Sequence, residues 1–231
     1  MQKTCEERAE SKAKTEIARR ILNHVFSPGE TVSENQLAET LSMSRTPIRT
    51  AIRELIAEGL LERTEPKGYI VARLTGEDMQ QVFAARQKLE GLAAELAASA
   101  ISPADQKTFS DLQEEISEIY MNWDKDRFTD YNERFHRAVA RASRNAYVER
   151  LLRQCFWRSQ LYIYAYDAYF ITPEESKERF STGLYGPTYY EHKAITDAIM
   201  AGDGNLAREV MERHIRSSYE SLSRRGGMPS P

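Results

Sequence analysis

Apolar side chains recur with a helical period along most of this 231-residue chain, and the pattern changes to a strand-like alternation between residues 60 and 71. Before this change, apolar residues at helical spacing predict three short helices, over residues 17–25, 34–41 and 44–59. After it, the helical period returns in six segments, over residues 77–100, 103–121, 124–142, 146–169, 187–201 and 204–223. The sequence therefore predicts a mainly α chain, in which three helices and a β-hairpin precede an all-α helical bundle.

Composition and turn-forming residues set the predicted domain boundaries. Residues 1–14 are polar and are predicted to form a solvated N-terminal tail. Residues 15–73 form the predicted N-terminal domain and residues 77–223 the helical domain, because the boundary segment at residues 72–76, Ala-Arg-Leu-Thr-Gly, interrupts both patterns. We also expect a loop inside the helical domain, over residues 171–186, where proline and glycine break the helical period.

Local signals agree with three N-terminal helices and a hairpin. Ser33 and Ser44 each precede a helical stripe and are suited to cap it, and Gly59 closes the third helix. Two strand-like runs, at residues 60–63 and 69–71, flank the turn-forming residues Glu-Pro-Lys-Gly. Three helices followed by a hairpin are the element order of a winged helix-turn-helix, which is a DNA-binding fold.

The third helix carries a row of arginines. Arg45, Arg49 and Arg53 recur at positions i, i+4 and i+8 and share one face, opposite the apolar stripe. A helix of this kind enters the major groove by its N-terminal end, where arginine can donate two hydrogen bonds to O6 and N7 of guanine. Arg45 lies nearest that end, Arg49 reaches either a base or a phosphate, and Arg53 either contacts DNA or pairs with a neighbouring glutamate. The alternative is a solvated amphipathic helix with surface ion pairs.

Other polar residues extend this candidate DNA-binding surface. Hydroxyl groups on the third helix can donate to phosphates or contact a thymine methyl group. The hairpin supplies a cation and a glycine at its tip, which is the wing of the fold. Asn35 is either a DNA contact or an ordinary surface residue, with equal weight. These further candidates are Asn35, Ser44, Thr46, Thr50, Lys67 and Gly68.

Composition excludes several classes of protein. The net charge is -3, but residues 1–73 carry 12 Lys+Arg and 11 Asp+Glu, whereas the rest of the chain carries 20 and 24. Two cysteines, Cys5 and Cys155, are too few for a disulfide framework or a cysteine metal cluster.

No apolar stretch is long enough to cross a bilayer, and the polar N-terminus does not resemble a signal peptide. We therefore expect a cytoplasmic protein without a membrane partner.

Three of the four histidines, His136, His192 and His214, fall on predicted helices of the second domain. Asn132 lies one turn before His136, so their side chains converge on one helix face. Helical bundles build metal sites from facing helices in this way. Scattered histidines are nevertheless more often surface or satisfied core residues, and the residues by themselves leave both readings open.

Arg86 interrupts a predicted helix that is rich in alanine and leucine. Its guanidinium group either pairs with Glu90 one turn later or points into the bundle, where it would hold a carboxylate with two hydrogen bonds. The aromatic residues between 156 and 169 either line a ligand cavity or fill the core, and core packing is the more common role of such a stripe.

The N-terminal motifs resemble the GntR family winged helix. The resemblance rests on Ser-Glu-Asn-Gln-Leu-Ala at residues 33–38, Ser-Arg-Thr-Pro-Ile-Arg at 44–49, Gly-Leu-Leu at 59–61 and Gly-Tyr-Ile-Val at 68–71. It implies that Arg45 and Arg49 contact DNA and that Thr46 and Gly68 lie in contacting elements. Family members commonly have Glu-Ala-Leu after the second arginine, and Thr-Ala-Ile stands there in this chain.

The second domain is similar to the FCD effector domain of the FadR subfamily. The similarity is carried by Arg-Gln-Lys-Leu-Glu at residues 86–90, by Asn132, Phe135 and Asn145, and by the three histidines. It implies a divalent metal held by an aspartate and three histidines, at positions that correspond here to Asn132, His136, His192 and His214. It also implies that Arg86 lines the effector pocket. Three imidazoles with one oxygen ligand suit zinc or nickel better than calcium or magnesium.

The leading hypothesis is a ligand-responsive transcription regulator, expected to act as a repressor. It would bind an inverted-repeat operator in double-stranded DNA as a homodimer and sense a small organic acid. A rival hypothesis is a metalloenzyme in which the histidines activate water, but the sequence lacks an HExxH motif, a nucleophile elbow, a P-loop and a dinucleotide-binding fingerprint. A ligand-independent architectural DNA-binding protein would leave the second domain without a role.

Overall fold

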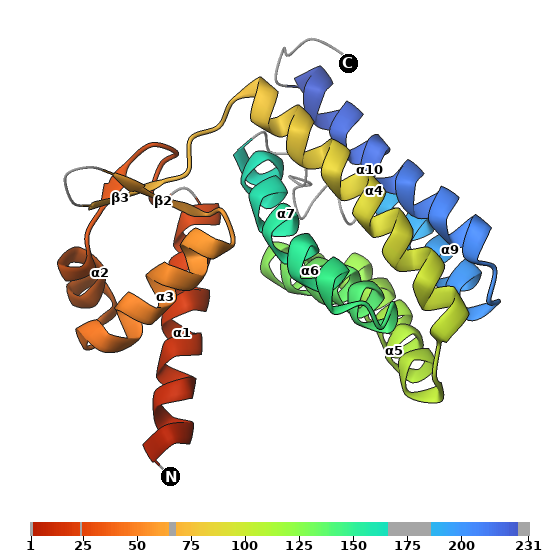
Figure 1. Cartoon of the computed structure of the whole chain (residues 1–231), viewed down its shortest axis with the longest axis horizontal. Helices are drawn as coiled ribbons and strands as arrows, with labels where there is room; N and C mark the ends of the chain where they lie inside the picture. Colours follow the sequence, from red (N-terminus) through yellow and green to blue (C-terminus); the bar gives the residue numbers. More distant parts are fainter. Residues whose placement is uncertain (1, 24, 65–67, 166–185, 226–231) are drawn as a thin grey trace. The chain divides into compact units, whose positions relative to one another are not determined.

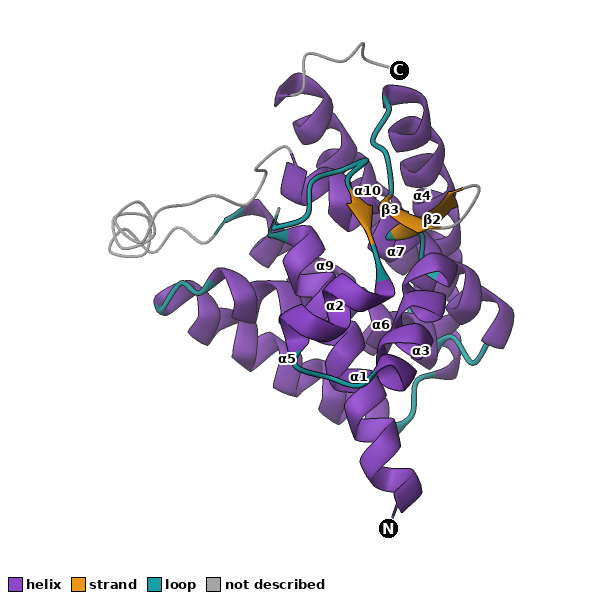
Figure 2. Ribbon diagram, turned by 90° about the vertical axis from the view of Figure 1, so that its left-hand side faces the viewer, coloured by secondary structure: helices purple, strands orange, loops and turns teal. Residues whose placement is uncertain are grey.

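The computed structural model describes residues 2–23, 25–64, 68–165 and 186–225 and is mainly α, as the sequence predicts (Figures 1 and 2). The chain divides into two compact units. The first unit contains residues 1–79 and residues 157–166, and the second contains residues 80–156 and 167–231. Among the described residues, no helix combines the length and apolar character needed to span a membrane.

The first unit has the predicted winged helix-turn-helix order. Its elements are α1 (Gln2–Leu22), β1 (Thr31–Val32), α2 (Glu34–Leu41), α3 (Arg45–Ala57), β2 (Leu61–Thr64) and β3 (Gly68–Val71). Strands β2 and β3 form the predicted antiparallel hairpin, with Leu61 opposite Val71. The short strand β1 was not predicted; it pairs with the free edge of β3 and gives the strand order β1-β3-β2.

Caps and turns place α2 and α3 next to each other. The Ser33 hydroxyl accepts a hydrogen bond from the Gln36 amide at 3.2 Å and so caps α2. Ser44 occupies the cap position of α3 with an extended backbone but makes no side-chain cap hydrogen bond. The turn between the two helices passes through Ser42 in the left-handed region, and Gly59 has φ of +74° where the chain leaves α3 for the sheet.

Helix α1 is longer than the sequence predicts. It begins at Gln2, so residues 2–14 are helical and the prediction of a solvated tail over residues 1–14 is wrong. Ala13 is fully buried, and the ammonium group of Lys14 lies 2.6 Å from Glu58 at the end of α3. Residues 10–14 of α1 therefore contact α3, although the composition of this segment is polar.

The apolar stripes of α1, α2 and α3 form the core of the first unit. Helix α1 ends at Leu22, so Val25 leaves the predicted stripe and is exposed, whereas Phe26 is buried. The largest fully buried side chains of this core are Ile17, Ile21, Leu37, Ile48, Ile52 and Leu55.

The end of α7 (Ala146–Ala165) belongs to the first unit and holds the segment that leads into α4 (Gly76–Ala100). The Arg158 guanidinium group donates to the backbone carbonyls of Gly59 and Arg73, at 3.2 and 2.7 Å, and to the Asp78 carboxylate at 2.7 Å. The Tyr162 hydroxyl lies 2.6 Å from the same carboxylate. Residues 73–78 are therefore fixed by side chains of α7.

The second unit is a helical bundle whose helices begin and end close to the predicted positions. Beside parts of α4 and α7, it contains α5 (Pro103–Met121), α6 (Lys125–Ala142), α9 (Pro187–Met200) and α10 (Gly204–Arg225). Helix α5 packs against α6 and α9, and α9 packs against α10. Phe156, Tyr162 and Tyr164 are buried as core residues, whereas Tyr166, Tyr169 and residues 171–185 of the predicted loop lie outside the described residues.

We expect Ile52→Ala to lower the free energy of unfolding by about 2–5 kcal/mol, because it opens a cavity between α3 and its neighbours. Arg53→Ala is the matched control on the same helix, and its exposed side chain predicts a change within about 0.5 kcal/mol. Urea unfolding followed by circular dichroism measures both. Equal losses for the two variants would contradict the packing of α3.

Candidate functional site

The three arginines of α3 lie on its exposed face, opposite the buried Ile48 and Ile52. Arg45 is in the first turn and Arg49 and Arg53 follow at one-turn intervals. The helix therefore presents its arginines outward, as the spacing predicts.

Arg49 is held by a carboxylate of the neighbouring helix. Its Nη2 atom lies 2.9 Å from Oε2 of Glu34, and its Nε atom lies 3.2 Å from the same oxygen. The Tyr69 hydroxyl donates to Oε1 of Glu34 at 3.2 Å. One carboxylate of α2 thus links helix α3 to strand β3 of the hairpin.

The hydrogen bonds from Arg49 lower the pKa of Glu34 below its ordinary value, although partial burial opposes the shift. The carboxylate is therefore ionised at neutral pH, and its negative charge stands next to the guanidinium group of Arg49. Arg45 adds a smaller electrostatic effect in the same direction.

The other candidate DNA-binding residues differ in their exposure and in their hydrogen bonds. Asn35, Ser44 and Thr46 are exposed. The Thr50 hydroxyl is half-buried and donates to Oε1 of Glu10 in α1 at 3.0 Å. Gly68 is the first residue of β3, and Lys67 lies outside the described residues.

The second candidate site is a cluster of three buried histidines. His136 comes from α6, His192 from α9 and His214 from α10. Each offers a ring nitrogen, and these nitrogens lie within 4.8 Å of one another. The structure therefore brings together the three histidines that the sequence singled out, and the triad is able to hold a metal ion.

Each imidazole is oriented through its Nδ1 atom. His136 Nδ1 is hydrogen-bonded to Oε2 of Glu90 in α4, and His214 Nδ1 lies 2.8 Å from Oε2 of Glu191 in α9. His192 Nδ1 lies 3.1 Å from the Tyr131 hydroxyl. Metal-binding histidines commonly donate their other ring N–H to a carboxylate in this way, which leaves Nε2 with its lone pair for the ion.

Two buried polar atoms of this cluster have no hydrogen-bond partner among the described residues. They are Nε2 of His192 and Oδ1 of Asn132, one turn before His136 on α6. Leaving such atoms unpaired in a core costs about 1–3 kcal/mol each, unless another ligand completes them. An imidazole nitrogen and an amide oxygen are both metal ligands, so these residues fit a bound divalent ion.

Burial controls the charge of the cluster. It lowers the pKa of His136 to about 4, against the opposing effect of Glu90, and lowers the pKa of His192 as well. Burial alone would raise the pKa of Glu90, but the charge of Arg86 and the hydrogen bonds of Glu90 lower it to about 2. The two imidazoles are therefore neutral at pH 7, and the carboxylate is ionised.

The sequence left open whether Arg86 pairs with Glu90 or points into the bundle. It is almost fully buried, and its Nε atom lies 2.5 Å from Oε1 of Glu90. Its guanidinium carbon also lies 5.1 Å from the centre of the Phe156 ring, and this ring lies 5.5 Å from that of His136. Arg86 therefore both pairs with Glu90 and points into the bundle beside the histidines.

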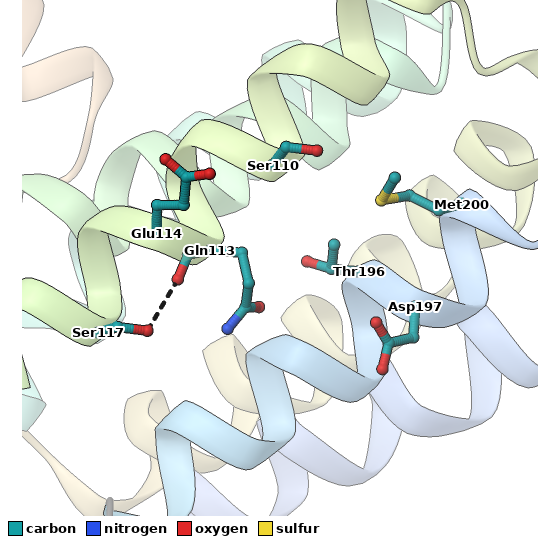
Figure 3. Close-up of a pocket in the computed structure, with 7 residues that line it drawn as sticks. All are labelled: Ser110, Gln113, Glu114, Ser117, Thr196, Asp197 and Met200. Atoms are coloured by element: carbon teal, nitrogen blue, oxygen red, sulfur yellow. Dashed lines mark hydrogen bonds between the residues drawn. The ribbon is translucent and has the colours of Figure 1, made fainter.

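A separate surface pocket of about 350 Å³ lies between α5 and α9 (Figure 3). The described residues that line it carry two carboxylates and no basic group, which makes it unsuitable for an organic anion. The lining residues are Ser110, Gln113, Glu114, Ser117, Thr196, Asp197 and Met200.

Comparison with protein-family models gives two matches that together cover most of the chain. The model described as "Bacterial regulatory proteins, gntR family" matches residues 9–71. The model described as "FCD domain" matches residues 81–217. The first match covers the arginines of α3 and the second covers the histidine cluster.

Individual relatives agree with these matches. The Bacillus subtilis protein named "Uncharacterized HTH-type transcriptional regulator YdhC" is 32% identical over 59% of this chain and 62% of its own length. A Paenarthrobacter nicotinovorans protein named "Probable D-xylose utilization operon transcriptional repressor" is 30% identical over 86% of this chain and 82% of its own length. Among solved structures, E. coli McbR/YncC has the same fold, with a TM-score of 0.71 and 20% identity over 92% of this chain and 97% of that chain.

Sequence reasoning missed the residues that orient the site side chains. Glu34, Tyr131 and Glu191 each contact their partner across helices, at sequence separations of 15, 61 and 23 residues. Glu90 was expected only as the partner of Arg86, at the local i, i+4 spacing. No spacing rule connects the long-range pairs, which arise from packing.

We expect the chain to bind Zn²⁺ and expect Glu191→Gln to weaken this binding roughly 10- to 100-fold, because the variant removes the carboxylate that holds His214 Nδ1. His192→Ala is expected to weaken it further, since it removes a ligand. Lys193→Gln is the control, because its side chain is partly exposed and pairs with Asp197 on the same helix. A competition titration against a zinc-binding dye measures all four proteins, and equal affinities would contradict a role of Glu191 in metal binding.

Proposed function

This chain belongs to the GntR family of bacterial transcription regulators and carries an FCD domain, and we propose that it is a repressor whose operator binding is controlled by a small organic acid. Its family and relatives are DNA-binding regulators rather than enzymes. The observation that carries the proposal is the buried histidine triad beside Arg86, in the same chain as an exposed row of arginines on α3. A role as repressor is supported by the name of the P. nicotinovorans relative.

The proposed DNA-binding surface is centred on Arg45 and Arg49. Arg45 is exposed in the first turn of α3, where a recognition helix meets base edges. Thr46 and Asn35 are exposed and extend the surface, with Ser44 and Gly68 as further contacts. We place Thr50 and Arg53 at its margin, since the Thr50 hydroxyl is engaged by Glu10 and Arg53 lies two turns from the tip.

We infer a homodimer on an inverted repeat. One winged helix contacts few base pairs, and a two-fold dimer doubles the contacts on a palindromic site. A cytoplasmic location follows from the proposal, because the operator lies in bacterial DNA.

We infer that His136, His192, His214 and Asn132 hold a divalent ion, with zinc and nickel as the favoured metals. Imidazole ligands suit both metals, and neutral ligands leave the positive charge of the ion largely uncompensated. The ion would supply a positive charge and an open coordination position to an anionic ligand. Arg86 is buried near the same histidines and would add positive charge, so a carboxylate is the ligand group that we propose.

Helix α7 offers a route from the ligand to the DNA-binding unit. Phe156 on this helix lies against His136 and Arg86 in the second unit. Two residues later, Arg158 donates hydrogen bonds to Asp78 and to the backbone carbonyl of Arg73 in the first unit. A ligand that favours one position of α7 would therefore change the hydrogen bonds that fix residues 73–78. Regulation requires such a difference between two states of the protein.

We expect Arg45→Ala and Arg49→Ala each to weaken binding to a selected operator about 5- to 150-fold at fixed salt, which corresponds to the loss of one arginine contact to guanine. Arg53→Ala is expected to cost less. Fluorescence anisotropy measures the affinities, and circular dichroism and sedimentation check that helix content and the dimer are unchanged.

Arg216→Ala is the matched control, because it removes one exposed positive charge from the second unit. Unchanged affinity in Arg45→Ala and Arg49→Ala would exclude the proposed recognition surface. Sedimentation as a monomer, both free and on DNA, would exclude the dimer.

We expect Asn132→Asp to tighten zinc binding about tenfold or more, because added ligand charge strengthens a metal site. The same change is expected to weaken binding of carboxylates, since it cancels part of the positive charge that attracts them. Calorimetry with zinc, and then with a panel of small mono- and dicarboxylates, measures both effects, and Asn132→Ala is the control that removes the oxygen ligand. Tighter carboxylate binding in Asn132→Asp, or a wild-type protein that binds neither zinc nor nickel, would contradict this mechanism.

A further inference from the structure

Glu34 uses only part of the hydrogen-bonding capacity of Arg49. A guanidinium group has five N–H donors, one on Nε and two on each terminal nitrogen. Glu34 contacts Nε and Nη2, which is the side of the group that faces α2. Glu34 leaves both donors of Nη1 and the second donor of Nη2 unused, and one N–H of each terminal nitrogen points outward, side by side at the end of the group.

This arrangement also changes the charge that Arg49 offers to DNA. The Glu34 carboxylate lies 2.9 Å from the guanidinium group, so the pair is close to neutral as a whole. A neutral pair attracts the charged phosphate backbone less than a free arginine does. The outward N–H groups of Arg49 are held in one direction by this contact. They fit two neutral acceptors that lie side by side, such as O6 and N7 of guanine in the major groove.

The carboxylate itself is fixed on two sides. Tyr69 in the wing strand donates to Glu34 at 3.2 Å. Glu34 is also the first residue of α2, where unpaired backbone N–H groups favour a negative charge. The side chain of Glu34 is 23% exposed, against 52% for Arg49. Glu34, which orients Arg49, is therefore the more buried of the two side chains.

We propose that Glu34 is a positioning residue that directs Arg49 to a guanine edge rather than to a phosphate. This inference rests on the proposed role of α3 in DNA recognition and chooses between the base and phosphate contacts that the sequence left open for Arg49. It adds a specificity role for an acidic residue that touches no DNA itself.

The test uses the full-length protein and an operator selected by the wild type from a random duplex library. Each G·C pair of one half-site is replaced in turn by A·T, and affinities are measured by anisotropy at fixed salt. Arg49→Lys identifies the base pair that depends on Arg49, because lysine keeps the charge and loses the paired donors. We expect the wild type to lose about 5- to 150-fold in affinity when that pair is replaced, and Arg49→Lys to lose little.

Glu34→Gln is the decisive variant. We expect it to lose most of the preference at that same base pair, while its affinity for an unrelated duplex stays the same or rises because a negative charge near DNA has been removed. Tyr69→Phe is expected to reduce the preference partly. Glu39→Gln is the matched control, since it removes one charge from an exposed position of the same helix and should keep the preference.

Three results would overturn the proposal. Glu34→Gln could keep the full preference at the Arg49-dependent pair, or it could weaken all duplexes by one factor, as a purely structural role would. Arg49→Lys could alter no base preference, which would assign Arg49 to a phosphate. Each of these results leaves the wider DNA-binding role intact, because that role fails only if Arg45→Ala and Arg49→Ala do not affect operator binding.

Discussion

The ion pair between Arg86 and Glu90 is the interaction on which the histidine cluster of the second unit depends. An unpaired buried charge costs several kcal/mol, so neither side chain is stable in this core without the other. Arg86 keeps Glu90 ionised, and the ionised carboxylate accepts the Nδ1–H of His136. This hydrogen bond fixes the tautomer of His136 and turns its Nε2 toward the other two histidines. A single pair on α4 therefore orients His136 on α6, which lies next to the histidines of α9 and α10.

The DNA-binding unit contains the same combination of groups in a different setting. Glu34 and Arg49 are also a carboxylate and a guanidinium group in hydrogen-bonding contact, but both are partly exposed. Solvent screens such a pair, so it contributes little to stability. What it contributes is the direction of the outward N–H groups of Arg49. Burial thus decides whether such a pair holds a core together or orients a surface side chain.

The parts that were predictable from the sequence are those set by local periodicity. The bundle helices follow from long stretches with one apolar period, and the Arg86–Glu90 pair and the Asn132–His136 face follow from i, i+4 spacing. The contacts of Glu191 with His214 and of Tyr131 with His192 depend on which helices pack together, and no local rule contains this information. The helical conformation of residues 10–14 was missed for a related reason, because this segment contacts α3 and has no apolar pattern of its own.

The neutral side chain at position 132 links metal binding to ligand binding in the proposed mechanism. In the histidine cluster the charges of Arg86 and Glu90 offset each other, and His136 and His192 are neutral. A divalent ion held there with Asn132 would keep most of its charge, and a bound anion would neutralise part of it. Each ligand would then raise the affinity for the other by the same factor, because coupling between two binding sites is reciprocal. An aspartate at position 132 would supply part of this negative charge permanently. The residue at position 132 therefore determines how strongly the metal affinity depends on the organic acid.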